Sequence, residues 1–259
     1  MKPLLVLVSL AVAATAAPLS SAKITQAIND VRVLGGSDAR AASVGETVGG
    51  SSSVQTGRKS RAELMFTDQT LTRLGQNSVF SFRNGSRDVE LKQGSILLQV
   101  PKNAGGATIR TATVTAAITG TTSMFEYSPG QSVKLLTLEG TQKLYINGSK
   151  TPVLVPAGQM IVMRPDGRVV PQPVTIDIAR LLATSPLAGK GTFGPLPAAS
   201  TEAIQNTVAQ QKAAKRSGAL KPTLSVVRGP RTRLLDDIRT FLPTHDPYID
   251  YERPDVPGQ

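Results

Sequence analysis

Turn signals that contain glycine recur through the middle of this 259-residue chain and limit the length of every segment between them. They run from residue 57 to residue 167, most of them about ten residues apart, a spacing typical of short strands joined by tight connections. Asn84-Gly85, Asn147-Gly148 and Asp166-Gly167 favour hairpins, because both residues of each pair tolerate a positive φ. The spacing therefore predicts β structure and no long helix between residues 44 and 170.

Between these turns, apolar and polar side chains alternate. Ala62, Leu64 and Phe66 fall on one side of an extended segment, and the same period of two recurs at 96–100 and 114–118. Ile96-Leu97-Leu98 and Met160–Met163 are apolar on both faces, so we expect them to lie centrally. The pattern predicts an all-β region of half-buried antiparallel or solenoid strands.

Composition changes beyond residue 170, where prolines divide the chain into short pieces. We predict three short helices there: one capped by Thr175, one capped by Ser200 or Thr201 and ended by Gly218, and one at residues 234–242. Short isolated helices are marginal in water, so we expect them to dock on the β region or on a partner. The predicted division is an all-β domain over residues 23–170 and a Pro-rich, partly disordered extension over residues 171–259.

The N-terminus has the pattern of a secretory signal peptide over residues 1–22. Lys2 is followed by an apolar run that is too short to span a membrane comfortably, and an uncleaved anchor is the alternative. Ala14-Thr15-Ala16 and Ser20-Ser21-Ala22 both fit the small-x-small cleavage rule, so cleavage after Ala16 and after Ala22 both stay open. We expect an exported protein, periplasmic or extracellular, with no transmembrane span in the mature chain.

Several classes of chemistry are excluded or disfavoured by composition. The chain has no Cys and no Trp, which excludes thiol catalysis, disulfides, Fe–S clusters and Cys-based zinc sites. Its single histidine, His245, lies between two prolines near the C-terminus, so we do not expect a positioned catalytic base. Carboxylates that could form a glycosidase-type pair are present in the β region: Glu63, Asp68, Glu90, Glu126 and Glu139. No feature marks one of them as an acid catalyst, and we expect no enzyme activity, cofactor or metal.

The chain is strongly basic, with 29 Lys and Arg against 18 Asp and Glu and a formal net charge of +11. This balance favours an anionic partner, such as nucleic acid, lipid headgroups or an anionic envelope polymer. Basic residues at 58–110 alternate with acidic ones and the aromatic residues are few, so we do not expect nucleic-acid binding.

A series of short motifs runs through the β region in a fixed order. Its main segments are residues 54–57, 60–68, 73–78, 91–96, 100–102, 109–112, 114–121, 138–140 and 155–159. Over about residues 44–165 this series resembles the FecR domain, a periplasmic module named after a bacterial iron-transport regulator. The resemblance implies that the following residues define the fold: Arg61, Asp68, Arg73, Gly75, Asn77, Gly94, Thr111, Gly120, Thr121, Gly140 and Gly158.

Elementary chemistry gives some of these positions a structural role. We expect Asp68 to accept hydrogen bonds from the amides of its own turn, and Arg61 to form an ion pair with Glu63 or Asp68. Gln69 departs from the family pattern, which usually has Gly after the Asp, and this leaves the type of that turn open.

The resemblance implies an all-β fold built as an elongated stack of short strands, either a β-solenoid or β-roll or a sandwich-like arrangement. It also implies a non-catalytic module that senses or binds another envelope protein. In the better-known regulators, a sigma-factor-binding region and a transmembrane helix precede the FecR domain. This sequence is expected to have only a leader there, so that mechanism is not carried over. The alternative is a carbohydrate-binding or peptidoglycan-binding module, and an enzyme with a carboxylate pair is the least favoured hypothesis.

Overall fold

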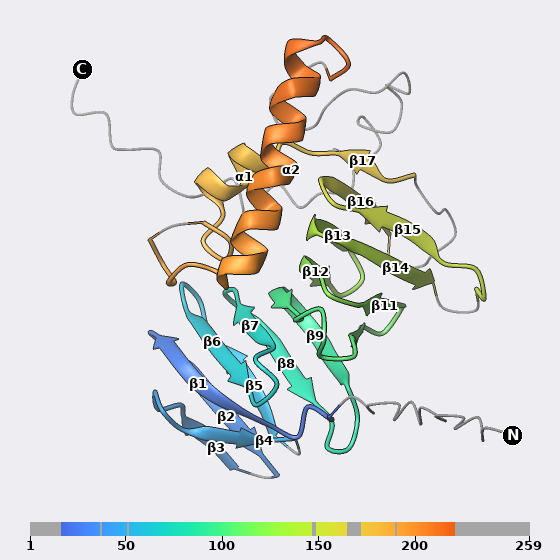
Figure 1. The fold of residues 1–259 in the computed structure, drawn as a ribbon. Coiled ribbons are helices and arrows are strands. Elements are labelled where there is room, and N and C mark those ends of the chain that lie inside the picture. The colour runs from blue at the N-terminus through green and yellow to red at the C-terminus, as the bar shows by residue number, and fades with distance from the viewer. Residues whose placement is uncertain are drawn as a thin grey trace, which may run out of the picture.

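The computed structural model describes residues 17–36, 38–50, 52–146, 149–164, 172–189 and 191–220. In these ranges seventeen strands form one hydrogen-bonded network, accompanied by two helices. The strands follow one another along an elongated stack, with the helices beside it (Figure 1). The predicted predominance of β structure is confirmed.

Strand pairing divides the network into two series, which we call ladder A and ladder B. Ladder A runs, in order, through β4 (Thr47–Gly49), β1 (Ser21–Ile28), β6 (Arg61–Phe66), β7 (Leu71–Leu74), β9 (Asp88–Gln99), β12 (Thr122–Ser128), β13 (Ser132–Glu139), β16 (Gln159–Met163) and β17 (Val174–Thr175). Ladder B runs through β3 (Asp38–Ala41), β2 (Val31–Gly35), β5 (Ser52–Thr56), β8 (Val79–Phe82), β9, β10 (Ala107–Arg110), β11 (Val114–Ile118), β14 (Thr141–Ile146) and β15 (Val153–Pro156). Among the described pairings, β9 with β10 is parallel and the others are antiparallel, so the network is mixed.

Strand β9 belongs to both ladders and joins them. Its first half pairs with β8 and β10 in ladder B, and its second half pairs with β7 and β12 in ladder A. Gly94 lies where the strand changes ladder, with a φ of 91° that favours glycine. A Cβ at this position would lie 2.4 Å from the Cα of Ser78, so the backbone approaches too closely for any side chain.

Alternate side chains of ladder A enter two different apolar cores. The inner core contains residues of both ladders, including Leu64, Phe80, Leu98, Ile109 and Leu144. The outer core joins the opposite face of ladder A to the helices and their connection: Leu71, Leu97, Met124, Leu136, Leu138, Met160, Val162, Ile176, Ile178, Leu187, Phe193, Leu196, Ile204 and Val208. The part of ladder A from β7 to β16 is therefore covered on both faces.

This double burial explains the two stretches that are apolar on both faces. Ile96, Leu97 and Leu98 are fully buried in β9, which is central as expected. Met160–Met163 are also buried, but β16 lies next to the edge strand β17. The expectation was right about burial and wrong about position, because a helical layer rather than further strands covers the outer face of β16.

Two helices follow the strands. Helix α1 (Ile178–Thr184) is capped by Asp177, which accepts a hydrogen bond from the Arg180 amide at 3.0 Å, so the predicted cap at Thr175 is wrong. The reason is that Val174 and Thr175 pair with β16 as strand β17.

Helix α2 (Ala198–Arg216) starts after Pro197, two to three residues before the predicted caps Ser200 and Thr201. It ends before Gly218, which has a positive φ as predicted. In the described ranges no helix is long and apolar enough to cross a membrane. The third predicted helix, at residues 234–242, lies outside the described residues.

We expect Gly94→Ala to lower the free energy of unfolding by about 2–4 kcal/mol, because the new Cβ collides with the Ser78 backbone in a left-handed conformation. Gly85→Ala is the matched control, because its φ of 75° is also left-handed but no atom lies within 4 Å of the added Cβ. It should cost only about 1 kcal/mol, the backbone penalty alone. Urea unfolding of both variants measures the difference, and equal losses would contradict the proposed steric role of Gly94.

Candidate functional site

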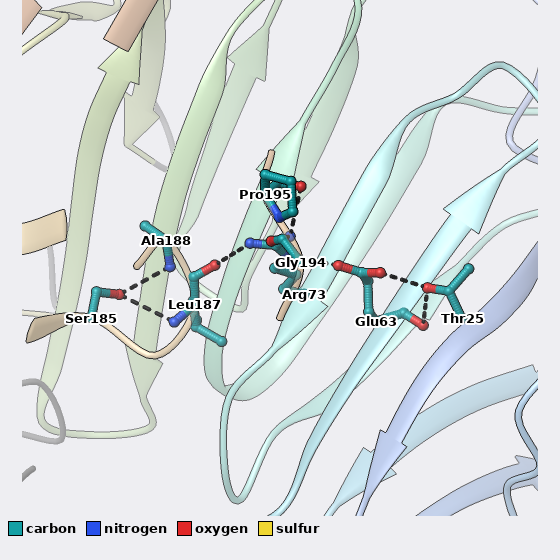
Figure 2. A network of polar contacts seen from close by, with 8 residues as sticks. All are labelled: Thr25, Glu63, Arg73, Ser185, Leu187, Ala188, Gly194 and Pro195. Carbon is teal, nitrogen blue, oxygen red and sulfur yellow. Dashed lines mark hydrogen bonds and ion pairs between the residues drawn. The ribbon is translucent and has the colours of Figure 1, made fainter. Parts of the chain in front are cut away.

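The most extensive buried polar cluster described lies on the outer face of ladder A and is centred on Arg73. Arg73 of β7 faces Glu63 of β6 in the strand register, and the exposed fractions of the two residues are 1% and 9%. Arg73 Nε donates to Glu63 Oε2 at 2.8 Å. Thr25 Oγ1, from β1, donates to Glu63 Oε1 at 2.8 Å. Three neighbouring strands thus supply one connected set of polar side chains (Figure 2).

The remaining donors of Arg73 hold a segment more than one hundred residues away in sequence. We call the described residues of this segment, 185–189 and 191–195, the strap. Arg73 Nη1 donates to the Leu187 carbonyl at 2.9 Å, and Nη2 donates to the Gly194 carbonyl at 2.6 Å. The Phe193 ring lies 4.9 Å from Arg73 Cζ, within the range of a cation–π contact. The planar guanidinium therefore binds a carboxylate on one side and carbonyls of the strap on the other.

The strap also contains a local turn that shapes it to receive Arg73. Ser185 is buried, and its Oγ accepts hydrogen bonds from the amides of Leu187 and Ala188, each at 3.2 Å. This turn follows α1 directly and directs the Leu187 carbonyl at the guanidinium (Figure 2). The side chain of Leu187 meanwhile enters the outer core, so the same residue contributes both a polar and an apolar contact.

Burial lowers the pKa of Arg73, while the hydrogen bond and the charge of Glu63 act in the opposite direction and leave it lowered overall. An arginine keeps its proton at any ordinary pH, so the cluster holds a permanent buried charge. Such a charge is tolerated only when it is paired and its donors are satisfied. Arg73 contacts Glu63 of β6 and two carbonyls of the strap, which indicates that the cluster fastens the strap to ladder A.

A second arginine–carboxylate pair lies at the β6–β7 turn. Arg87 Nη2 contacts Asp68 Oδ2 at 2.6 Å, and Asp68 accepts from the Thr70 amide and the Thr70 hydroxyl, both at 2.9 Å. The expected turn-fixing role of Asp68 is thus visible in its contacts. Gln69 has a φ of 66°, so it adopts the left-handed conformation that the glycine of the family pattern would take easily.

Glu63 and Asp68, the two carboxylates expected to pair with Arg61, form ion pairs with Arg73 and Arg87. Arg61 lies two residues from Glu63 on the same strand, whereas Arg73 lies directly opposite Glu63 on the neighbouring strand, where Cβ atoms approach most closely. The spacing of residues along one strand therefore did not identify the ion-pair partner of Glu63.

The five carboxylates considered for a catalytic pair each contact a different partner. Besides Glu63 and Asp68, Glu126 pairs with Lys134 at 3.2 Å, Glu139 accepts from the Thr122 hydroxyl at 2.9 Å, and Glu90 accepts from Ser81 at 3.4 Å. Among the residues that the structure describes, no group of three or more His, Cys, Asp or Glu could hold a metal ion. His245 lies outside the described residues.

Two of the remaining family positions form a buried corner between the ladders. The Gly75 carbonyl accepts from Thr56 Oγ1 at 2.6 Å and from Ser78 Oγ at 3.0 Å, and a Cβ on Gly75 would lie 2.0 Å from Ser95 Oγ. Asn77 takes a positive φ of 52° in the same corner.

The other family positions lie at connections between strands. Thr111 Oγ1 accepts from the Val114 amide in the β10–β11 turn, at 3.1 Å. Gly120 and Gly140 have positive φ and flank the buried Thr121, whose Cγ2 would lie 2.4 Å from a Cβ on Gly140. Gly158 has a positive φ and leaves room for Gln211 of α2.

Sequence reasoning missed Gln211 and the strap. Gln211 Nε2 donates to the Ile176 carbonyl at 2.7 Å, and its Oε1 accepts from the Ile178 amide at 3.1 Å, so it joins α2 to the start of α1. A signal was present, because Ile204, Val208 and Gln211 have the spacing of one helical face. The strap had no such signal, because it contacts Arg73 through backbone carbonyls, which every residue type has.

We expect Arg73→Met to lower the free energy of unfolding by about 3–5 kcal/mol, because it leaves Glu63 buried without its cation. Arg73→Met combined with Glu63→Gln should recover part of this loss. Arg32→Met is the matched control, since Arg32 forms an exposed pair with Asp30 and should change stability by about 0.5 kcal/mol or less. Urea unfolding measures stability, and limited proteolysis measures strap release. A stable Arg73→Met variant with a protected strap would contradict the anchor.

Comparisons with known proteins follow the same part of the chain. Residues 52–141, from β5 to the start of β14, match the family model described as FecR protein. No curated protein matches the chain.

Two solved structures are similar at a low level. Each is described as a "putative anti-sigma factor" from Parabacteroides distasonis ATCC 8503. The first, at 1.65 Å resolution, is 14% identical and aligns over 65% of this chain and 92% of its own, with a TM-score of 0.46. The second, at 2.50 Å resolution, is 14% identical and aligns over 68% of this chain and 96% of its own, with a TM-score of 0.45. Neither similarity is close enough to carry an argument.

The family match covers the strands that contain Glu63, Arg73, Gly94 and the Gly75 corner, and it confirms the resemblance drawn from the motifs. Residues 52–141 of the chain therefore match the FecR family and are consistent with a FecR-type domain.

Proposed function

We propose that this protein is exported and acts as a non-catalytic interaction or sensing module that binds another envelope protein. The observation that carries the proposal is that the strand network is open, with an apolar edge strand at one of its ends. In the described structure, β15 pairs on one side with β14 and is the last strand of ladder B. An unpaired strand edge can accept a strand from another chain through backbone hydrogen bonds.

The edge formed by β15 combines an exposed apolar side chain with a cation. Leu154 is 54% exposed on the face away from the inner core, directly opposite the exposed Lys143 of β14. An exposed apolar side chain at an unpaired strand edge can pack against a strand that is added there. This pair suits a partner segment that carries apolar and acidic side chains, in keeping with the net charge of +11.

The edge at the other end of ladder B fits this role less well. Strand β3 is exposed throughout, but it carries Asp38 and Arg40, and charged side chains discourage strand addition at an edge. Arg40 also pairs with Glu46, which follows β3 in the chain. We therefore place the partner site at β15.

Glycan binding, the alternative, is supported less by the distribution of aromatic side chains. Sugar-binding faces commonly use exposed aromatic rings, as their flat faces stack on the sugar. In the described ranges, the phenylalanines and Tyr127 are buried, while Tyr145 is half-buried. An electrostatic contact with an acidic glycan remains an outcome that the experiment distinguishes.

We expect a photoreactive residue at position 154 to form a covalent adduct with an envelope protein in intact cells. The same residue at Gln205, an exposed position on α2 far from the strand edge in sequence, is the matched control and should give no such adduct. After the captured protein is identified, titration of the purified pair should show Leu154→Lys binding at least about tenfold more weakly, because the apolar contact is lost.

Three results would contradict the proposal in different ways. Recovery of cell-wall polymer in place of protein would support the glycan-binding alternative. Equal adducts from positions 154 and 205 would remove the β15 edge as the site. A measured turnover of any substrate by the purified protein would contradict a non-catalytic module.

A further inference from the structure

We infer that the leader is cleaved between Ala16 and Ala17, and that residues 17–22 remain in the mature protein as part of its fold. The sequence offers two cleavage positions, after Ala16 and after Ala22, and both satisfy the small-x-small rule. The inference rests on the export that the proposed function includes. It concerns how the chain is processed, and it follows from contacts that the segment 17–22 makes with the domain.

Burial separates the two positions clearly. Ala17 and Pro18 are exposed, whereas Leu19 and Ala22 are each 1% exposed and belong to the inner core. Cleavage after Ala16 leaves the new terminus in solvent, two residues before the first buried side chain. Cleavage after Ala22 would remove both buried side chains and leave the space of a leucine empty, which is among the more costly changes to a core.

Backbone hydrogen bonds of residues 19–22 also favour cleavage after Ala16. The Leu19 amide donates to the Ser86 carbonyl at 2.9 Å, and the Ser20 carbonyl accepts from the Gly50 amide at 3.1 Å. Strand β1 begins at Ser21, and Ala22 pairs with Val48 of β4 and with Phe66 of β6. Residues 19–22 thus link β1 to its two neighbours in ladder A and to the loop before β9, and a chain beginning at Lys23 would lose these bonds.

Arg87 adds a polar contact to the segment. Its guanidinium donates to the carbonyls of Ala17 and Gly106 while pairing with Asp68. The same arginine therefore holds the first retained residue, a loop of ladder B and the β6–β7 turn. The contact uses the carbonyl of Ala17, which cleavage between Ala16 and Ala17 leaves intact.

The cleavage reaction is a simple hydrolysis. Water adds across the Ala16–Ala17 peptide bond, the leader departs with the new carboxylate of Ala16, and Ala17 keeps the new α-amino group. Ala16 lies directly before the bond and Ala14 two residues earlier, and these are the two positions at which the rule requires small side chains.

The primary test is the identity of the first residue of the exported protein. The full chain with its own leader is produced in a Gram-negative host, and the periplasmic material is examined by intact mass and N-terminal sequencing. We expect Ala17 as the first residue. A chain that begins at Lys23 would overturn the inference and leave the export proposal standing, whereas a chain that begins at Met1 would overturn both.

Two leader variants make the test specific. Ala16→Leu places a large side chain at the bond and should stop cleavage there, so that precursor accumulates. Ser20→Leu disables only the second position, at an exposed residue, and should leave Ala17 as the first residue. The opposite pattern, with normal processing of Ala16→Leu and a block in Ser20→Leu, would overturn the inference.

A stability measurement supplies a second readout. Chains beginning at Ala17 and at Lys23 are released from a cleavable fusion partner, with Leu19→Ala in the longer chain as the matched control. We expect Leu19→Ala to lower the Tm by about 5–15 °C. The chain from Lys23 should lose at least as much or fail to fold. Equal Tm values for the two chains would show that residues 17–22 are dispensable and would overturn the inference.

Discussion

Burial of ladder A on both faces from β7 to β16 is the constraint on which the rest of the structure depends. Its inner face packs against ladder B, and its outer face carries Leu97, Met124 and Leu136, which would otherwise meet water. An apolar sheet face must be covered, and helices α1 and α2 with the strap provide that cover. The C-terminal segments are therefore a layer of the same fold as the strands they cover.

Arg73 makes this cover specific. Apolar contacts alone would let the strap settle on the outer face in several ways, since burial has no directional preference. A buried guanidinium does have a directional preference, because each of its planar donors must find an acceptor. Glu63 satisfies one side and the carbonyls of Leu187 and Gly194 satisfy the other, so a single arrangement of the strap removes the cost of burying the charge.

Strand β9 has a comparable role between the two ladders. It pairs with four strands, and its change of ladder at Gly94 is what allows one chain to form both faces of the inner core. The buried charges of Arg73 and Glu63 are used in contacts within the fold. Among the described strands, β15 ends ladder B and leaves Leu154 exposed, and this edge is where we propose that a partner binds.

Short-range features were predictable from the sequence. The glycine-rich turns, the alternation in β6, the double burial of Ile96-Leu97-Leu98, the turn closed by Asp68 and the helix end at Gly218 each depend on a few neighbouring residues. The FecR resemblance also came from local motifs and was confirmed over residues 52–141. What the sequence determined by itself was therefore which segments extend, where they turn and which faces are apolar.

Tertiary structure alone decided which of these segments meet. Nothing near Arg73 in the sequence indicates carbonyls at Leu187 and Gly194, and the strands β1, β2 and β3, ahead of the recognised motifs, had no predicted place. Thr175 has the composition of a helix cap but pairs as strand β17, so Asp177 caps α1 instead. The physical reason is common to all three: local preferences amount to a fraction of a kcal/mol per residue, whereas burial and the pairing of buried polar groups depend on partners that only the complete fold brings into contact.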